Sequence, residues 1–391
     1  MGPDPTPPFF VPYHDMIRPG LKSLSKLMFL SDMIYAIMFE KLWRLATLDV
    51  GIDLGTANTV VHVRGKGVVI RQPSVVARHI KTKEILAIGE EARKMLGKNP
   101  ANIEVVRPLR DGVIADFDAA EAMLKHYIRE IHDLYKGFGF KIPRPRVALG
   151  IPSGVTEVER RAVHEAALSA GARAAFLIEE PMAAAIGAGL PVDKAEGQMM
   201  IDIGGGTSEI GIISLSGLVL NRSLRIAGDE LTEAVVNFAR SKYSLLLGES
   251  SAEEVKIAVG SAFPLKREKE GSPLQIVVRG RSLENGLPKS LKLTSIEIRE
   301  ALMPVLQVIL SEIALIIEET PPEIVSDILE KGMVMAGGGS LIRGLDKLIS
   351  EETGMPVWIT ENPLEAVVRG CARVLEDDSL LRKVRVTGGL S

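Results

Sequence analysis

Phosphate chemistry is first suggested by an aspartate and the turn of small residues that follows it. Asp53 ends the apolar stretch LDVGID, and the turn from Leu54 to Asn58 separates it from a second β-rich stretch, TVVHVR. Two such stretches around a short turn predict a β-hairpin. Small residues let backbone N–H groups approach an anion, and Asp53 would face a Mg²⁺ ion beside the bound phosphate. On this motif alone, a purely structural hairpin turn is the alternative interpretation.

The same arrangement recurs later in the chain, in the stretch MMIDIGGGTSEIGII. Asp202 ends an apolar stretch, and a glycine turn leads through Thr207 into a second strand; the turn residues are Gly204, Gly205 and Gly206. Two aspartate-glycine turns, each between strands, predict two similar domains whose hairpins face each other. Phosphates between them would be held from both sides, and Asp53 and Asp202 could share one metal ion.

A third glycine turn, from Val334 to Ser340, follows an apolar strand and precedes the helix-like stretch LIRGLDKLISEET. Its glycines would admit a base or ribose against the backbone, and we expect the N-terminus of the following helix to add a favourable dipole. The Walker A pattern and a GxGxxG motif after the first strand are both missing from the sequence. A P-loop or a Rossmann dinucleotide site is therefore disfavoured.

The elements between the two hairpins alternate between strand and helix. VALGIP is typical of a buried strand, residues 156–170 of a helix with a capping box at Thr156 and Glu159, FLIEEP of another strand, and MAAAIGAGL of a small-residue helix. This alternation predicts an α/β fold. Glu180 follows a strand at the edge where α/β sheets place ligands, so it could orient or deprotonate a water that attacks a terminal phosphate. For Glu179 and Glu180 alike, the alternative is a charge that complements a helix N-terminus.

Composition limits the classes of function. The chain has 391 residues, 46% of them apolar, and a net charge of −3, which suits two sizeable cores and argues against a disordered chain. The near-neutral balance argues against nucleic acid as a partner. The lone cysteine, Cys371, excludes an internal disulfide framework and multi-cysteine zinc sites and fits a reducing cytosol. Uninterrupted apolar runs stay shorter than the roughly 18 residues of a membrane span.

The N-terminal segment has two parts. Residues 1–20 contain six prolines, which disfavour a packed helix or strand, and residues 1–37 carry little functional weight because they could precede the true start. Further on, Phe39, Leu42 and Trp43 fall on one helical face together with Ala46, and Lys and Arg flank them. Such a stripe suits a helix lying in a membrane interface, with an ordinary helix packed on its own domain as the alternative.

Taken together, these residues resemble the MreB family of bacterial actin homologues from about Leu48 to about Glu376. The resemblance is carried by GIDLGTANT, GIPSGVTEVERRAV, FLIEEPMAAAIGAGLP, DIGGGTSE, RIAGDELTEAV, TPPEIVSDILEKGMVMAGGGSLIRGLDKLI and ENPLEAVVRGCARVL. It implies an actin-like (ribonuclease H-like) α/β fold, in which duplicated domains, each with a smaller subdomain, surround a nucleotide cleft. The expected divisions are an N-terminal extension at 1–47 with an amphipathic helix near 38–47, domain I at 48–190, domain II at 191–376 with its final helices packed back on domain I, and a tail at 377–391.

The resemblance also implies an ATP site with Mg²⁺. Asp53 and Asp202 match the Mg²⁺-associated carboxylates, and Glu180 and Thr207 match the groups that position the hydrolytic water. The matches to the nucleotide-binding segments are Gly55, Thr56, Ala57, Asn58, Gly204, Gly205, Gly206, Glu253, Glu254, Val255, Lys256, Ala336, Gly337, Gly338 and Gly339. Two positions depart from the family pattern, because Glu254 stands in place of Arg and Ala336 in place of Thr, and either change could alter nucleotide affinity.

Members of the family form filaments of paired protofilaments on the inner face of the cytoplasmic membrane, where they organise wall synthesis and maintain rod shape. The resemblance therefore implies a slow ATPase that assembles as a homopolymer, with the wall-elongation proteins MreC, MreD and RodZ as partners. Phe39, Leu42 and Trp43 match the family's membrane helix, and Phe138 and Phe140 match its apolar membrane loop; phenylalanines folded into the core are the alternative for that loop. Two other hypotheses are a soluble ATP-dependent phosphotransferase of the same superfold and a scaffold that binds nucleotide but scarcely hydrolyses it.

Overall fold

The computed structural model describes residues 48–134 and 144–386. In this part of the chain, the first predicted hairpin belongs to a five-stranded sheet with the strand order β10-β9-β1-β2-β3. Its strands are β1 (Asp49–Leu54), β2 (Asn58–Val63), β3 (Gly67–Pro73), β9 (Arg146–Ile151) and β10 (Ala174–Glu179). β1 is antiparallel to β2 and parallel to β9, so the hairpin lies on one side of β1 and the parallel strands on the other.

The second predicted hairpin belongs to another five-stranded sheet, with the order β13-β12-β11-β17-β18. Its strands are β11 (Gln198–Ile203), β12 (Ser208–Ser214), β13 (Gly217–Leu224), β17 (Met333–Ala336) and β18 (Val357–Ile359). β11 is antiparallel to β12 and parallel to β17. The two sheets therefore share one topology, which confirms the predicted duplication of an α/β unit. We call the parts built on them the first and second halves.

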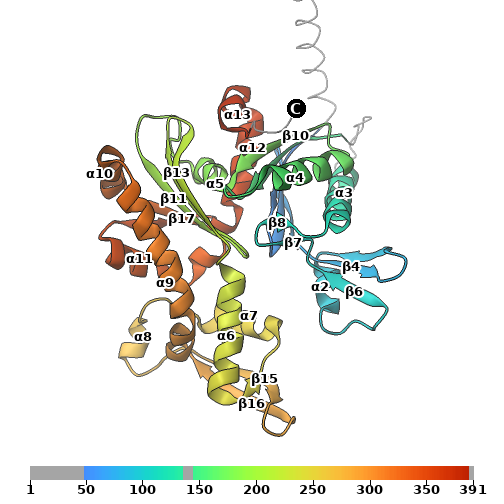
Figure 1. The fold of residues 1–391 in the computed structure, drawn as a ribbon, viewed down its shortest axis with the longest axis vertical. Helices are drawn as coiled ribbons and strands as arrows, with labels where there is room; N and C mark the ends of the chain where they lie inside the picture. The colour runs from blue at the N-terminus through green and yellow to red at the C-terminus, as the bar shows by residue number, and fades with distance from the viewer. Residues whose placement is uncertain (1–47, 135–143, 387–391) are drawn as a thin grey trace, which may run out of the picture. The chain divides into compact units, whose positions relative to one another are not determined.

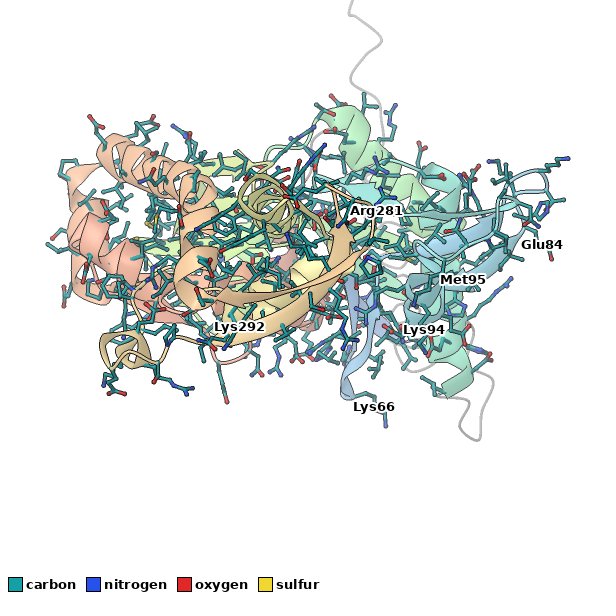
Figure 2. The ribbon with its side chains drawn as sticks, turned by 90° about the horizontal axis from the view of Figure 1, so that it is seen from below. Lys66, Glu84, Lys94, Met95, Arg281 and Lys292 are labelled. Atoms are coloured by element: carbon teal, nitrogen blue, oxygen red, sulfur yellow. The ribbon has the colours of Figure 1, made fainter. Side chains whose placement is uncertain are left out.

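Each half also carries smaller elements. The first half adds a three-stranded sheet, a two-stranded pair and a short helix, namely β4 (Val76–His79), β5 (Ile85–Ile88), β6 (Ile103–Val106), β7 (Leu109–Arg110), β8 (Val113–Ile114) and α2 (Glu90–Met95). The second half adds the sheet β14 (Leu245–Leu246), β15 (Gln275–Ser282) and β16 (Pro288–Thr294). Figure 2 shows Glu84 in the turn between β4 and β5 and Lys66 in the turn between β2 and β3, both pointing outward. It also shows Arg281 and Lys292 on β15 and β16.

Helices cover the sheets and connect their strands. They are α3 (Phe117–Leu134), α4 (Glu157–Ser169), α5 (Glu180–Ala188), α6 (Gly228–Tyr243), α7 (Glu249–Val259), α8 (Lys266–Lys269), α9 (Ser295–Glu319), α10 (Pro322–Lys331), α11 (Leu345–Thr353), α12 (Ala366–Glu376) and α13 (Asp378–Val384), with short 3-10 helices η1 (Gly339–Leu341) and η2 (Pro363–Glu365). The capping box predicted at Thr156 and Glu159 is confirmed at the start of α4. Figure 1 shows α6 and α7 between the second sheet and the β15–β16 hairpin.

The helices α5 and α12 cross at an unusually short distance. A Cβ atom added at Gly187 of α5 would lie 1.8 Å from the carbonyl oxygen of Ala366, and one added at Gly370 of α12 would lie 1.8 Å from the carbonyl oxygen of Ala183. Side chains larger than hydrogen are therefore excluded at both glycines. α12 also packs against β1 and β9, although it follows the second sheet in the chain. The predicted domain boundaries themselves stay a prediction.

Buried apolar side chains form one large core in each half and a further cluster that joins them. The joining cluster contains Ala148 of β9, Met200 of β11, Met182 of α5 and Val374 of α12. Since its members come from both sheets, the two halves are packed together along α5 and α12.

Within residues 48–134 and 144–386, one helix has the length and composition of a membrane span. α9 has a mean hydropathy of 1.9 over its most apolar part. Its buried residues recur every three or four positions along one face, which packs into the core of the second half; they are Ser295, Ile298, Leu302, Leu306, Ile309, Ile313 and Ile316. Length and composition are thus weak evidence for a span here.

The membrane-facing residues predicted from the sequence lie outside the described part of the chain. These are Phe39, Leu42 and Trp43 in the N-terminal helix, and Phe138 and Phe140 in the apolar loop. Their contribution stays a prediction.

Candidate functional site

A cavity of about 400 Å³ lies where the three predicted glycine turns meet. Its walls include the ends of β1 and β11 and the turn that follows β17, which come from the two sheets. The predicted site residues that line it are Asp53, Gly55, Thr56, Ala57, Asn58, Glu180, Asp202, Gly204, Gly205, Gly206, Thr207, Glu253, Lys256, Gly337, Gly338 and Gly339. Asp53 and Asp202, far apart in the sequence, therefore share one cavity.

Three carboxylates face this cavity without an ion-pair partner among the described residues: Asp53, Glu180 and Asp202. Burial raises the pKa of Asp53 to about 7. The pKa of Asp202 is raised well above its usual range by burial and by the charges of Asp53 and Glu209. Clustered acids without a basic partner lose repulsion when a cation binds, so the pair Asp53 and Asp202 fits a divalent ion beside phosphate oxygens.

Glu180 is the first residue of α5 and lies between the two halves of the site. Burial raises its pKa well above the usual value, and the charges of Glu209, Asp53 and Asp202 raise it further. A carboxyl group of this kind has an increased affinity for a proton, which suits it to accept one from a water molecule. Its neighbour Glu179 ends β10 outside the cavity lining, where burial raises its pKa.

The two turns predicted to hold phosphate, at 55–58 and 204–206, approach each other closely. A Cβ atom at Gly205 would lie 2.7 Å from Cβ of Ala57, and one at Gly206 would lie 2.7 Å from Oγ1 of Thr56. The N–H of Gly112 donates a hydrogen bond of 3.1 Å to the same Thr56 hydroxyl. The glycines of the second turn thus make room for the side chains of the first turn, in addition to exposing backbone N–H groups.

On the far side of the cavity, α7 presents one face. Lys256 Nζ lies 2.6 Å from the Glu253 carboxylate and donates to the carbonyl of Gly228 at 2.7 Å and to Oγ1 of Thr232 at 2.9 Å. Glu253 and Lys256 line the cavity because residues three apart share a helix face. Of the two predicted residues between them, Glu254 is exposed and Val255 is buried in the core of the second half, and neither lines the cavity.

The third turn approaches β11 closely. Gly337 has φ +78°, and a Cβ atom there would lie 2.4 Å from Oδ1 of Asp202, so only glycine fits. Ala336 pairs with Asp202 in the parallel ladder and is fully buried, outside the cavity lining. The expectation that a helix starts directly after this turn is wrong. The chain forms the short 3-10 helix η1 and then a left-handed residue, Gly344, so that α11 begins only at Leu345.

Further residues line the cavity that were not among the predicted site residues. They are Leu54, Val60, Arg71, Gly112, Gly228, Asp229, Leu231, Ile257, Leu341, Ile342, Arg343, Pro363, Leu364 and Val367. Ile257 was within reach of the sequence, because it directly follows the predicted run at 253–256. Most of the others lie on loops and helix ends that only the tertiary fold brings together.

Two arginines of the first half form ion pairs with acidic residues of the second half. Arg107 lies 3.2 Å from Asp229 in α6 and also contacts Glu249 in α7. Arg71 in β3 contacts Glu365 in η2. Because Arg71 and Asp229 themselves line the cavity, these ion pairs connect the two halves beside it.

The sequence of this chain is similar to those of known proteins that belong to one family. The sequence profile described as MreB/Mbl protein matches residues 47–383. The cell shape-determining protein MreB of Escherichia coli K12 is 49% identical over 343 residues, which cover 87% of this chain and 96% of that protein.

Solved structures show the same similarity in three dimensions. MreB5 of Spiroplasma citri bound to ADP superimposes with a TM-score of 0.79 at 35% identity, covering 86% of this chain and 98% of that one. The same protein bound to AMPPNP gives a TM-score of 0.78 at 36% identity, with the same coverage. The actin-like fold expected from the sequence is confirmed, and the chain belongs to the MreB/Mbl family.

Proposed function

We propose that this chain is an actin-like ATPase that assembles into filaments at the inner face of the cytoplasmic membrane and there maintains cell shape by organising wall synthesis. The observation that carries the proposal is the shared cavity of Asp53, Asp202 and Glu180 in a member of the MreB/Mbl family. A cell shape-determining relative matched over 96% of its length supports the cellular role.

The cavity walls suggest how ATP would lie. Backbone N–H groups of the turns at 55–58 and 204–206 would hold the phosphates from two sides. Glu253 and Lys256 would face the ribose, and apolar side chains of Ile257, Leu341 and Leu364 would contact the base. The bound ADP and AMPPNP in the related MreB5 structures support a nucleotide here.

Asp53 and Asp202 would hold Mg²⁺, which when bound neutralises phosphate charge and polarises the phosphoryl group. The fit rests on the chemistry of the donors, because both side chains offer hard oxygen ligands and neither has an ion-pair partner among the described residues. Their raised pKa values reflect the same lack of compensating charge.

Glu180 and Thr207 would act on the attacking water. The Glu180 carboxylate is buried, and its raised pKa favours accepting the proton that the water loses. The Thr207 hydroxyl, at the end of the second turn, would orient the same water by a hydrogen bond.

Assembly would be coupled to the nucleotide through the position of the two halves. Nucleotide held by turns from both halves favours the arrangement in which they are close, and the ion pairs of Arg107 and Arg71 favour the same arrangement. Subunits in that arrangement would fit the filament, and hydrolysis would weaken the contacts between them.

Membrane binding and partners belong to the proposal as well. Phe39, Leu42 and Trp43 would insert into an anionic leaflet from the N-terminal helix, assisted by Phe138 and Phe140. The wall-elongation proteins MreC, MreD and RodZ are the partners expected from the family. A soluble phosphotransferase is less well supported, because the chain matches a cell shape-determining protein over nearly its whole length.

The test is sedimentation of the full chain with Mg²⁺ and ATP across protein concentrations, with phosphate release measured in parallel. A critical concentration, together with phosphate release that follows assembly, is the expected result. Turnover that requires a small acceptor and ignores protein concentration would support the phosphotransferase. Assembly without phosphate release would support a nucleotide-binding scaffold.

Deleting residues 1–47 tests the membrane part of the proposal. Cosedimentation with phosphatidylglycerol-containing liposomes should fall severalfold, while polymerisation persists, because the helix would supply apolar contact with the bilayer. Equal cosedimentation after deletion would remove the N-terminal helix from the membrane role and leave the loop around Phe138 and Phe140 as its candidate.

A further inference from the structure

A fully buried carboxylate that was not among the predicted site residues lies next to Asp202 of the cavity. Glu209 in β12 is 0% exposed and pairs directly with Asp202 of β11 in the antiparallel ladder. In the first sheet, the residue in the same relation to Asp53 is Val60. A charge buried in place of an apolar residue is costly to keep, so its environment must stabilise it.

Glu209 is held by hydrogen bonds from both halves of the molecule. Its Oε2 atom accepts from the backbone N–H of Ser153 at 3.0 Å and from the Ser153 hydroxyl at 2.6 Å. Its other oxygen accepts from the hydroxyl of Ser223 in β13. Ser153 belongs to the turn after β9 in the first half, whereas Glu209 and Ser223 belong to the second sheet. One carboxylate thus bridges the two halves.

The strand that carries this bridge also contacts the helix that carries Glu180. A Cβ atom at Gly211, two residues beyond Glu209, would lie 2.6 Å from Cβ of Pro181, so β12 touches α5 beside Glu180. Glu180 itself packs on β9, because a Cβ atom at Gly150 would lie 3.5 Å from its Cγ atom. β12 therefore contacts the supports of Glu180 on both sides, at the turn after β9 and at the first turn of α5.

The charges agree with this geometry. Burial raises the pKa of Glu209, whereas the hydrogen bonds from Ser153 and Ser223 lower it and so favour its charged form. After burial, the charge of Glu209 is the largest influence that raises the pKa of Glu180, ahead of Asp53 and Asp202.

We propose that Glu209 is a positioning residue for hydrolysis: by joining Ser153 and Ser223 across the two halves, its carboxylate fixes Glu180 relative to the phosphate turns. This inference rests on the proposed ATPase activity. A purely structural buried hydrogen bond would instead affect folding stability and leave the chemistry of the folded molecule unchanged.

The test replaces the carboxylate by an amide of the same shape, Glu209→Gln, in the full chain. Phosphate release per assembled subunit should fall roughly tenfold, because the hydrogen bonds from Ser153 and Ser223 weaken when their acceptor loses its charge, while the affinity for a fluorescent ATP analogue changes less than about threefold. Ser153→Ala and Ser223→Ala should each give part of this loss. Added to Glu209→Gln, neither should lower the rate much further, because the three residues act as a unit.

The controls separate positioning from folding. Ile313→Val and Ile313→Ala, in the core of the second half, give graded losses of melting temperature and should leave the release rate of the folded protein unchanged. Should Glu209→Gln unfold, the two serine variants carry the test. A Glu209→Gln rate equal to wild type, or to an Ile313 variant of the same melting temperature, overturns the positioning role alone. A wild-type protein that assembles but releases no phosphate overturns the ATPase proposal and the positioning role together.

Discussion

The two hairpins that meet at the cavity are alike in topology and different in chemistry. Each places an aspartate at the end of a central strand, Asp53 on β1 and Asp202 on β11, with a hairpin partner on one side and a parallel strand on the other. The first turn carries the side chains of Thr56, Ala57 and Asn58, whereas the second is three glycines. Opposite the aspartate, the first hairpin has the apolar Val60 and the second has Glu209.

Under the proposed function, the duplication supplies similar turns on both sides of the phosphates, whereas hydrolysis would depend on the residues in which the two hairpins differ. Both aspartates lie at equivalent positions in their hairpins and would bind the same ion in the proposed site. The buried charge of Glu209 has no counterpart opposite Asp53, where Val60 stands. Three predictions test which residues make the two sides of the cavity differ in function.

The largest effect is expected at Glu180. Glu180→Ala should retain nucleotide binding and lower phosphate release by about a hundredfold, the lower range of what a positioned general base contributes. Single-turnover phosphate release from sedimented filaments measures it. Glu179→Ala is the matched control, because Glu179 lies outside the cavity lining and should retain the wild-type rate within a few-fold. An unchanged rate of phosphate release in Glu180→Ala would show that Glu180 does not take part in hydrolysis.

A smaller effect is expected from adding a methyl group to the second turn. Gly205→Ala places a Cβ atom 2.7 Å from Cβ of Ala57, which should push the turns apart and weaken nucleotide binding roughly tenfold. Titration with a fluorescent ATP analogue measures the affinity. The double variant with Ala57→Gly should recover part of the loss, since the colliding methyl group is gone. Equal affinity in all three proteins would show that the turns do not constrain each other.

The smallest effect concerns pH and the two aspartates. Burial raises the pKa of Asp53 to about 7, so the nucleotide-free protein binds this proton more tightly when folded than when unfolded. Its folding is therefore favoured at low pH, and this stability is lost as pH rises through about 7. In chelator, Asp53→Asn should raise the melting temperature by a few degrees at pH 8 and change it little near pH 4.

Asp202→Asn sharpens this prediction. Its pKa is raised by burial and by two neighbouring charges, so the gain at pH 8 should have the same sign and exceed that of Asp53→Asn. A gain in either variant that is no greater at pH 8 than at pH 4 would contradict the proposed cost of the buried charges.

The sequence was informative where local pattern decides structure. Alternating apolar stretches around short turns gave both hairpins, and the spacing of Thr156 and Glu159 gave the start of α4. Helical periodicity explains why only Glu253 and Lys256 of the predicted run at 253–256 line the cavity. The sequence pattern already indicated that Val255 is buried and does not line the cavity, because it is an apolar residue between charged ones.

Other features depend on contacts between distant segments and have no local signature. Glu209 looks like a surface residue in an alternating strand, and only the turn at Ser153 explains its burial. The late start of α11 is another case. Gly344 adopts φ +75° and interrupts the apolar pattern that predicts a helix from Leu341 onward. Arg71 and Asp229 reach the cavity from segments whose sequence alone gives no sign of a ligand.

The crossing of α5 and α12 holds the two halves together through close backbone contact. Gly187 meets Ala366 while Gly370 meets Ala183, so each helix offers the same pair of residues to the other, as identical copies do across an isologous dimer interface. With backbones this close, a residue larger than glycine at either position would have to push the two helices apart. Because α5 and α12 also contribute to the apolar cluster that joins the halves, such a substitution would loosen the packing between the halves as well as the helix pair itself.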